Sequence, residues 1–339
     1  KKSDMAQMTG FDDGEEETVI NLTVKPGMKQ GWFGNAYGGY GSKDRYEGNA
    51  MVNRFVNNDQ ITFMGGANNT NNMGFSDLAS TMFSGMGGGG GRRGGFGAGS
   101  GITSSGNAGL NFSKEFKPDK LTLGGNTRYS HSDNDARSKS DRQNILPGDS
   151  SSYDNSEAMS RTKSDNFGVD FRLEWKPDTM TQLIFRPSFS LSHSMNDNFS
   201  DATTLDNERD TVNTNKSNNY SESNGYNLNA SIDFSRKLNN KGRVFSATLS
   251  GGNSDSYSDG MNRSDIVYFN QTDALKNSII DQRSRYDNKG FNYRAYVSWV
   301  EPIGHNNFIQ ATYSISQRKQ EALKNVYNQD ADGIYNVLD

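Results

Sequence analysis

Asp170, Arg172 and Glu174 place two carboxylates and a guanidinium at every second position of one short segment. If this segment is a strand, the three side chains share one face, because successive side chains of a strand point to opposite faces. Paired carboxylates serve general acid–base catalysis only where their surroundings shift their pKa values. The sequence indicates no such surroundings, and lining a water-filled interior explains these residues without catalysis. We therefore predict no enzyme activity and no catalytic residue.

Nucleophilic and metal chemistry also lack their sequence signatures. There is no Gly-x-Ser-x-Gly motif and no cysteine. His131, His193 and His305 are too few and too scattered to predict a metal site, although His131 and His193 both fall near the external ends of predicted strands. A group of aspartates raises bound calcium as an alternative: Asp133, Asp135, Asp141, Asp149 and Asp154. Their spacing, however, matches no Ca²⁺-binding loop. We predict no metal and no cofactor.

A glycine-rich segment at residues 85–97 contains the basic pair Arg92-Arg93. Two sharp interpretations are an RGG-like segment that binds nucleic acid and a glycine-rich loop that holds a phosphate. A single basic pair is weak support for nucleic-acid binding. A phosphate-binding loop needs a following helix with Lys-Ser/Thr, which the sequence lacks. The net charge of −4 gives no general attraction for nucleic acid either. We interpret the segment as a flexible external loop and predict no nucleic-acid partner.

The average composition is unusual for a packed globular protein. Only 32% of the residues are hydrophobic and the mean hydropathy is −0.87, so disorder is the first alternative. Aromatic residues make up 11% of the chain, however, and they fall on alternating positions. A transmembrane barrel has this average composition, because half of each strand faces water and its loops are polar. The lack of cysteine excludes a disulfide scaffold, and no apolar run reaches the length of a membrane helix.

Apolar and polar residues alternate one by one in eleven segments, a pattern typical of strands with two unlike faces. The clearest is 167–175, in which Phe, Val, Phe, Leu and Trp are interleaved with Gly, Asp, Arg and Glu. Pro187 cannot donate a ladder hydrogen bond, but the alternation continues on both sides of it, so we keep that strand. The predicted strands lie near residues 31–41, 46–56, 60–67, 107–116, 121–129, 167–175, 183–191, 226–234, 245–249, 291–299 and 309–315.

The predicted connections alternate between short and long. Residues 117–120 (Lys-Pro-Asp-Lys) and 176–179 (Lys-Pro-Asp-Thr) have the chemistry of tight turns. Bacterial outer-membrane barrels have short periplasmic turns and long external loops, with aromatic residues at the membrane interface. In this sequence Trp175 and Trp299 stand at strand ends beside short turns, where such interfacial aromatics belong. A soluble β-sandwich is the alternative, but it would not need such long loops. Long polar loops are predicted near residues 68–106, 130–165, 192–225 and 250–289.

The sequence therefore predicts an all-β protein, an antiparallel transmembrane β-barrel of the bacterial cell outer membrane with long external loops. Lipid would contact its apolar face, and its polar face would line a water-filled interior. The residues predicted to face this interior are polar or charged members of four strands: Asp170, Arg172, Glu174, Arg186, Asn227, Asn229, Asp233, Asn292 and Arg294.

Two parts of the chain resemble a known family. The strand-like residues 19–25 (VINLTVK) followed by residues 31–41 (GWFGNAYGGYG) resemble the junction between plug and barrel in TonB-dependent outer-membrane receptors. Residues 181–190 (TQLIFRPSFS) resemble a strand of the Bacteroidota branch of these barrels. The resemblance covers most of the chain from about Val19, and its motifs are mostly patterns that β-barrels in general share.

The resemblance implies a barrel of about twenty-two strands, of which this chain would supply about eleven. Residues 1–28 would be the end of the plug domain and a linker, and residues 29–339 the N-terminal half of the barrel. The chain has no signal peptide and ends without a terminal strand, so we expect it to be a piece of a longer protein. The plug domain and TonB would be partners through segments that this sequence lacks.

The leading functional hypothesis is a TonB-dependent receptor-like transport protein. It would import a nutrient such as a glycan, a peptide or a siderophore through a plugged barrel, with a surface lipoprotein as a further candidate partner. The alternative is an outer-membrane barrel that acts as a structural or surface-interaction protein without gated uptake. The composition of the loops is generic and does not identify a ligand.

Overall fold

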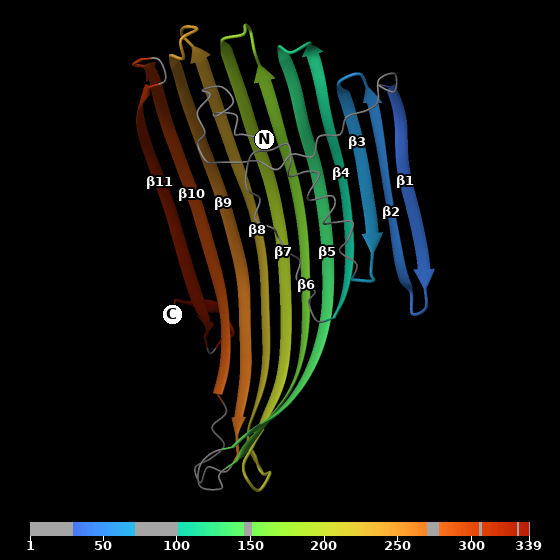
Figure 1. The fold of residues 1–339 in the computed structure, drawn as a ribbon. Coiled ribbons are helices and arrows are strands. Elements are labelled where there is room, and N and C mark those ends of the chain that lie inside the picture. Colours follow the sequence, from blue (N-terminus) through green and yellow to red (C-terminus); the bar gives the residue numbers. More distant parts are fainter. Residues whose placement is uncertain are drawn as a thin grey trace.

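The computed structural model describes residues 30–71, 101–145, 151–269, 278–304, 307–330 and 332–338. In these ranges the strands form one antiparallel sheet, and its twelve members follow the order of the sequence (Figure 1). No helix in the same ranges is long and apolar enough to cross a membrane. The predicted plug segment at residues 1–28 and the glycine-rich segment at residues 85–97 lie outside the described residues.

The strands differ in length, and those from β5 to β11 are the longest. Their bounds are β1 Gln30–Gly41, β2 Arg45–Val56, β3 Asp59–Asn68, β4 Ile102–Lys117, β5 Leu121–Asn144, β6 Ser152–Trp175, β7 Thr181–Leu205, β8 Thr211–Lys237, β9 Val244–Tyr268, β10 Ser278–Pro302, β11 Phe308–Gln329 and β12 Tyr335–Leu338.

All eleven predicted segments are strands, which confirms the all-β antiparallel prediction. The bounds of β1, β2 and β3 differ from the predicted ones by one residue at most. The prediction was wrong at the end of the chain, where β11 continues to Gln329 and the four-residue β12 follows it. Among the described residues β1 pairs only with β2, and β12 pairs only with β11, so the sheet is open at both edges.

Three of the long loops predicted from the sequence are wrong. Their residues extend the strands β5 to β10, and the pairing of β5 with β6 continues from Leu121–Trp175 to Asn144–Ser152 without interruption. These segments are rich in Ser, Asn, Asp and Thr, so they carry no apolar signal. The backbone hydrogen bonds of the ladder form without apolar side chains. Short polar side chains add contacts across the ladder, such as Ser132 Oγ to Ser164 Oγ at 3.1 Å. We call the parts of β5–β11 beyond the apolar alternation the polar extensions.

The predicted tight turns join strands at the opposite end of the sheet, which is uppermost in Figure 1. In the first turn the amide of Lys120 donates to the carbonyl of Lys117 at 3.0 Å, and Asp119 has a φ of 57°. In the second, the carboxylate of Asp178 accepts a hydrogen bond from the amide of Met180 at 2.8 Å. Both are tight turns as predicted, and the second shows the expected Asx contact, in which the side chain bonds the backbone two residues on. We call this end of the sheet the short-turn end.

Strand register gives the sheet two unlike faces. The apolar face carries the apolar residues of β6 and their cross-strand partners, so Phe167 pairs with Tyr129 on one side and with Leu191 on the other. The polar face carries Asp170 and Glu174 with their partners. Most large apolar side chains of the apolar face are exposed, with Leu249 at 55% and Tyr313 at 70%.

The described chain has almost no hydrophobic core. Only four apolar side chains are buried, and three of these, Ile184, Val244 and Val300, lie near the short-turn end of the polar face. A continuous exposed apolar surface of this kind is unusual in a soluble monomer and marks a surface that another phase or partner covers.

Candidate functional site

The polar face brings together all nine residues that the sequence predicts to face an interior. Asp170 pairs with Ser188, and Ser188 pairs with Asn229, so these residues form one row across β6, β7 and β8. Arg186 lies one row nearer the short-turn end, opposite Ser231. The remaining members occupy alternate positions of the same face: Arg172, Glu174, Asn227, Asp233, Asn292 and Arg294.

The row of Asp170 continues toward β2 through small polar side chains. Asn126 pairs with Asp170 and with Asn111, and the row ends on Thr62 and Asn53, which are only 1% exposed. The hydroxyl of Thr62 donates to Asn53 Oδ1 at 2.6 Å. Among the described residues, however, the buried Nδ2 of Asn53 has no hydrogen-bond partner, so this row is not fully satisfied within the single sheet.

Arg186 and Asp233 form a half-buried ion pair on the polar face. The guanidinium of Arg186 donates to Asp233 Oδ2, and the hydroxyl of Thr248 donates to Oδ1 at 2.8 Å. The side chains of Arg186 and Asp233 are 18% and 29% exposed. The carboxylate therefore has partners from both neighbouring strands, and the three residues connect β7, β8 and β9.

The two carboxylates that raised the possibility of acid–base chemistry are each paired with cations. Glu174 lies 2.7 Å from Lys176 Nζ and 3.3 Å from Arg172 Nη2, and it accepts a hydrogen bond from Gln182 at 2.8 Å. Asp170 accepts a hydrogen bond from Arg128 at 2.8 Å. Both carboxylates are therefore held by neighbouring side chains of the wall, which suits a structural role.

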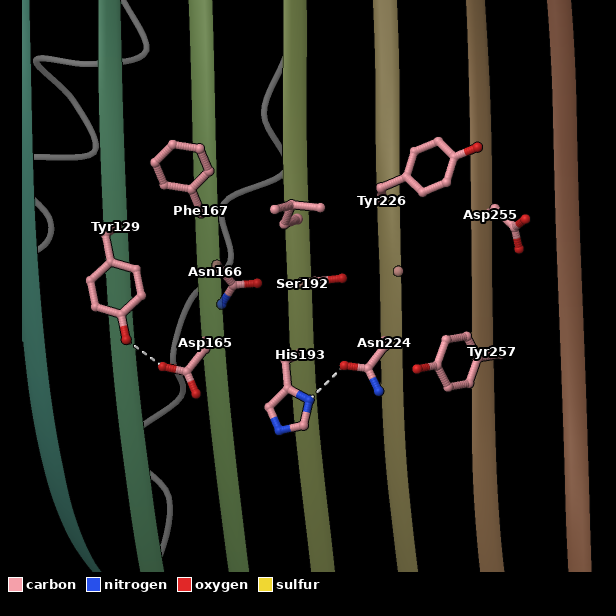
Figure 2. A pocket seen from close by; sticks show the side chains of 12 residues that line it. Tyr129, Asp165, Asn166, Phe167, Ser192, His193, Asn224, Tyr226, Asp255 and Tyr257 are labelled. Carbon is pink, nitrogen blue, oxygen red and sulfur yellow. Dashed lines mark hydrogen bonds between the residues drawn. The ribbon is translucent and has the colours of Figure 1, made fainter.

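A second site, which the sequence does not predict, lies on the apolar face where the apolar residues give way to the polar extensions. It is a shallow depression of about 520 Å³ formed by β5 to β9. Tyr129 bounds it on one side and Tyr226 and Tyr257 on the other, as Figure 2 shows. Phe167 and Leu191 form its border toward the short-turn end.

Polar side chains form the outer border of the depression. Asp165, His193 and Asn224 lie in one row, because Asp165 pairs with His193 and His193 with Asn224. The hydroxyl of Tyr129 donates to Asp165 Oδ1 at 2.5 Å, and His193 Nδ1 lies 2.8 Å from Asn224 Oδ1 (Figure 2). His131 continues the row, with Nδ1 2.8 Å from Asp165 Oδ1.

The histidines and aspartates singled out in the sequence do not form a metal centre in the described ranges, where no group of three or more His, Asp or Glu could hold an ion. His131 and His193 do lie in one row, on either side of Asp165. Asp133 is paired with Arg161. Asp154 accepts hydrogen bonds from Asn144 and Thr204, while Asp149 and His305 lie outside the described residues.

Aromatic residues also border the apolar face at the short-turn end. Trp299 donates from Nε1 to Glu301 Oε2 at 3.1 Å, and Arg243 holds the same carboxylate with Nε to Oε2 at 2.8 Å. Trp175, on β6, lies at the same end, in a row with Leu121 and Leu183. Tyrosines at one border and tryptophans at the other leave the apolar side chains between them.

Comparisons with known proteins add little to this geometry. No family model matches the sequence, and no curated protein matches it. Among solved structures, the chain is similar to the ferric-catecholate import receptor Fiu of E. coli K12 in its open form. The identity is 9% and the TM-score 0.20, over 91% of this chain and 73% of that one. A likeness at this level carries no argument about function.

Proposed function

We propose that this chain forms part of the wall of an outer-membrane β-barrel and that the whole protein is a transport protein of the TonB-dependent receptor type. The observation that carries the proposal is the separation of the two faces over β3 to β11. One face exposes large apolar side chains, and the other collects ion pairs and amides. Lipid outside and water inside are the surroundings that suit these two faces.

The height of the apolar band supports this proposal. On β6 the band runs from Phe167 to Trp175, which is roughly 26 Å at about 3.3 Å per residue. A tilted transmembrane strand needs about 9–11 residues. Tyr129 and Tyr226 at one border, with Trp175 and Trp299 at the other, match the aromatic girdles expected at the two surfaces of a bilayer.

The polar face supports transport over catalysis. Its carboxylates are paired with cations and its amides are arranged in rows, so it offers many polar contacts to a plug domain or a passing solute. We assign no catalytic role to it. Import of a nutrient, with TonB and a plug domain as partners and a surface lipoprotein as a further one, follows from the family resemblance of the sequence.

Neighbouring cysteines on β8 test the orientation of the wall. This chain has no cysteine, so each substitution adds a single thiol to it, and labelling of the parent protein gives the background. In the full-length protein in its native membrane, we expect Asn229→Cys to react with a charged, water-soluble maleimide. Leu228→Cys should react only with a lipid-soluble one. Equal reaction of both variants with the water-soluble reagent would refute a membrane wall.

The polar extensions favour a second candidate function, binding of a surface partner without gated uptake. They form a continuous sheet beyond the apolar band and carry exposed ion pairs such as Lys139–Glu157. Replacing residues 136–160 with a short turn would remove the outer part of the β5–β6 hairpin and keep the pair Asp135–Arg161. Loss of partner binding with undiminished solute uptake would identify binding as a separate function. If deleting the gene impairs uptake of no solute, the transport proposal fails.

A further inference from the structure

We propose that the depression bounded by Tyr129, Tyr226 and Tyr257 binds the sugar headgroup of a glycolipid in the outer leaflet. This inference rests on the proposed function, because it requires lipid to cover the apolar face. The depression lies where the apolar band meets the polar extensions. A lipid headgroup occupies this level of a bilayer when its acyl chains lie against the band.

The side chains match the chemistry of a sugar ring. Aromatic rings offer flat apolar surface with a polar tip, which suits the C–H face and the hydroxyl edge of a pyranose. Tyr129 and Tyr226 stand on opposite sides of the depression (Figure 2). The hydroxyl of Tyr226 donates to Asn253 Oδ1 at 2.8 Å, and the hydroxyl of Tyr129 donates to Asp165, so both side chains are fixed in place.

The outer border supplies hydrogen-bonding groups of both kinds. Asp165 uses Oδ1 for Tyr129 and His131, which leaves Oδ2 as an acceptor. Asn224 uses Oδ1 for His193, which leaves its amide Nδ2 as a donor. A sugar hydroxyl both donates and accepts, so it can bond to the carboxylate and to the amide.

The charges disfavour a phosphate headgroup. Two carboxylates, Asp165 and Asp255, line the depression, and His193 is its one residue that can become a cation. Two cations lie at its border and are engaged by carboxylates: Lys289 Nζ is 3.7 Å from Asp255, and Arg285, which lies over the Tyr257 ring, donates to Asp259. Like charges facing a phosphate would repel it, whereas a neutral or amino sugar meets no such penalty.

Lipid retention in mass spectra of the full-length protein tests this assignment. The protein is reconstituted in phosphatidylcholine vesicles that carry either a monoglucosyl diacylglycerol or an equal fraction of phosphatidylglycerol. It is then extracted gently into detergent, and bound lipids are counted by native mass spectrometry. We expect the protein to retain the glucolipid in preference to phosphatidylglycerol. Equal retention of the two lipids would overturn the assignment of a sugar.

The strand β8 offers a matched control, because the spacing Asn-x-Tyr occurs twice on the same face. The double variant Asn224→Leu, Tyr226→Leu should lower the apparent affinity for the glucolipid about tenfold, since it removes one ring and one amide. The variant Asn218→Leu, Tyr220→Leu, farther out on the extension, should leave it unchanged. Tyr226→Phe keeps the ring and should retain most of the binding. If both double variants bind like the parent, the site is wrong.

Flotation of the same vesicles separates this inference from the proposed function. Protein that does not float with the lipid in a density gradient refutes the membrane wall and the lipid site together. Protein that floats but shows no preference for the glucolipid refutes the site alone.

Discussion

Arg161 of β6 forms a bidentate ion pair with Asp133 of β5, with Nε 3.0 Å from Oδ1 and Nη2 2.7 Å from Oδ2. The pair is diagonal across the ladder, because Asp133 stands opposite Lys163 and Arg161 opposite Asp135. Both residues belong to a stretch that the sequence predicts to be a loop. Diagonal neighbours of this kind are within reach of long side chains in antiparallel sheets, and they help to hold the polar extensions in register.

The pair predicts a pH dependence of the β5–β6 extension. Hydrogen bonds from Arg161 hold the pKa of the Asp133 carboxyl below its ordinary value of about 3.9. A lowered pKa in the folded state stabilises the extension above the ordinary value, and this contribution is lost as the pH falls through the lowered value. We expect amide protection factors of residues 130–144 and 152–165, measured by hydrogen exchange, to hold from about pH 7 to 5 and to fall below about pH 4.

The variant Arg161→Gln provides the comparison. It should lower protection near Asp133 at neutral pH and weaken the pH dependence there, because the largest cause of the lowered Asp133 pKa is removed while Lys163 still acts on the carboxyl. Lys117→Gln, at the other end of the sheet, should leave the profile unchanged. An unaltered profile in Arg161→Gln would show that the pair does not hold the extension.

The sequence predicts the strands of the apolar band because each places a large apolar side chain at every second position. Phe167 to Trp175 is the clearest example. The sequence does not predict the polar extensions, because residues such as Ser132 and Thr162 occur as readily in loops as in strands. Their strand structure depends on partners many residues away, such as Ser164 and Asn196. The depression was missed for the same reason, since register alone places Tyr129 and Tyr226 in one row.

Pro187 shows how a strand accommodates a residue that cannot donate a hydrogen bond. It pairs with Ala230 of β8, whereas the ladder toward β6 has no pairs between Asp170–Ser188 and Leu173–Phe185. The missing donor therefore coincides with a gap in the ladder. We expect Pro187→Ala to change the free energy of unfolding by no more than about 1 kcal/mol in urea titrations of the protein in lipid vesicles.

A proline placed two residues farther along the strand gives the contrast. Phe189 pairs with Val169 of β6 in the intact ladder. Phe189→Pro should therefore destabilise the protein by about 1–3 kcal/mol beyond the loss measured for Phe189→Ala, since it removes a ladder donor and leaves its acceptor unpaired. Equal effects of the two Phe189 variants would contradict this account of the gap.

Arg186 and Asp233 should show strong energetic coupling. Arg186→Gln leaves the half-buried Asp233 carboxylate with the neutral hydroxyl of Thr248 as a donor, and Asp233→Asn removes the carboxylate to which Arg186 donates. We expect each single variant to lower the free energy of unfolding by about 1–3 kcal/mol. The double variant should lose less than the sum of the two. A double-mutant cycle measured by urea unfolding in vesicles checks this, and strict additivity would show that the ion pair contributes nothing of its own.

Trp299 should report the short-turn border of the bilayer. Its indole donates to Glu301, which also binds Arg243, so the ring is fixed between a charged group and the apolar band. An amphipathic indole of this kind belongs at the interface of a bilayer. The chain has three tryptophans. Replacing Trp32 and Trp175 with phenylalanine leaves Trp299 as the one indole of this chain, and the signal lost in Trp299→Phe isolates its contribution, which lipids brominated at different depths then locate.

We expect lipids brominated near the headgroup end of the acyl chain to quench Trp299 more strongly than lipids brominated near the chain terminus. The matched variant has Trp299→Phe and Val297→Trp in the same background, which moves the indole two residues inward on the same face of β10. That shift is roughly 7 Å along the strand, so the preference should move toward the deeper bromine positions. If quenching is absent at both positions, lipid does not contact this face. If the depth is the same at both, the short-turn end is not the border of the bilayer.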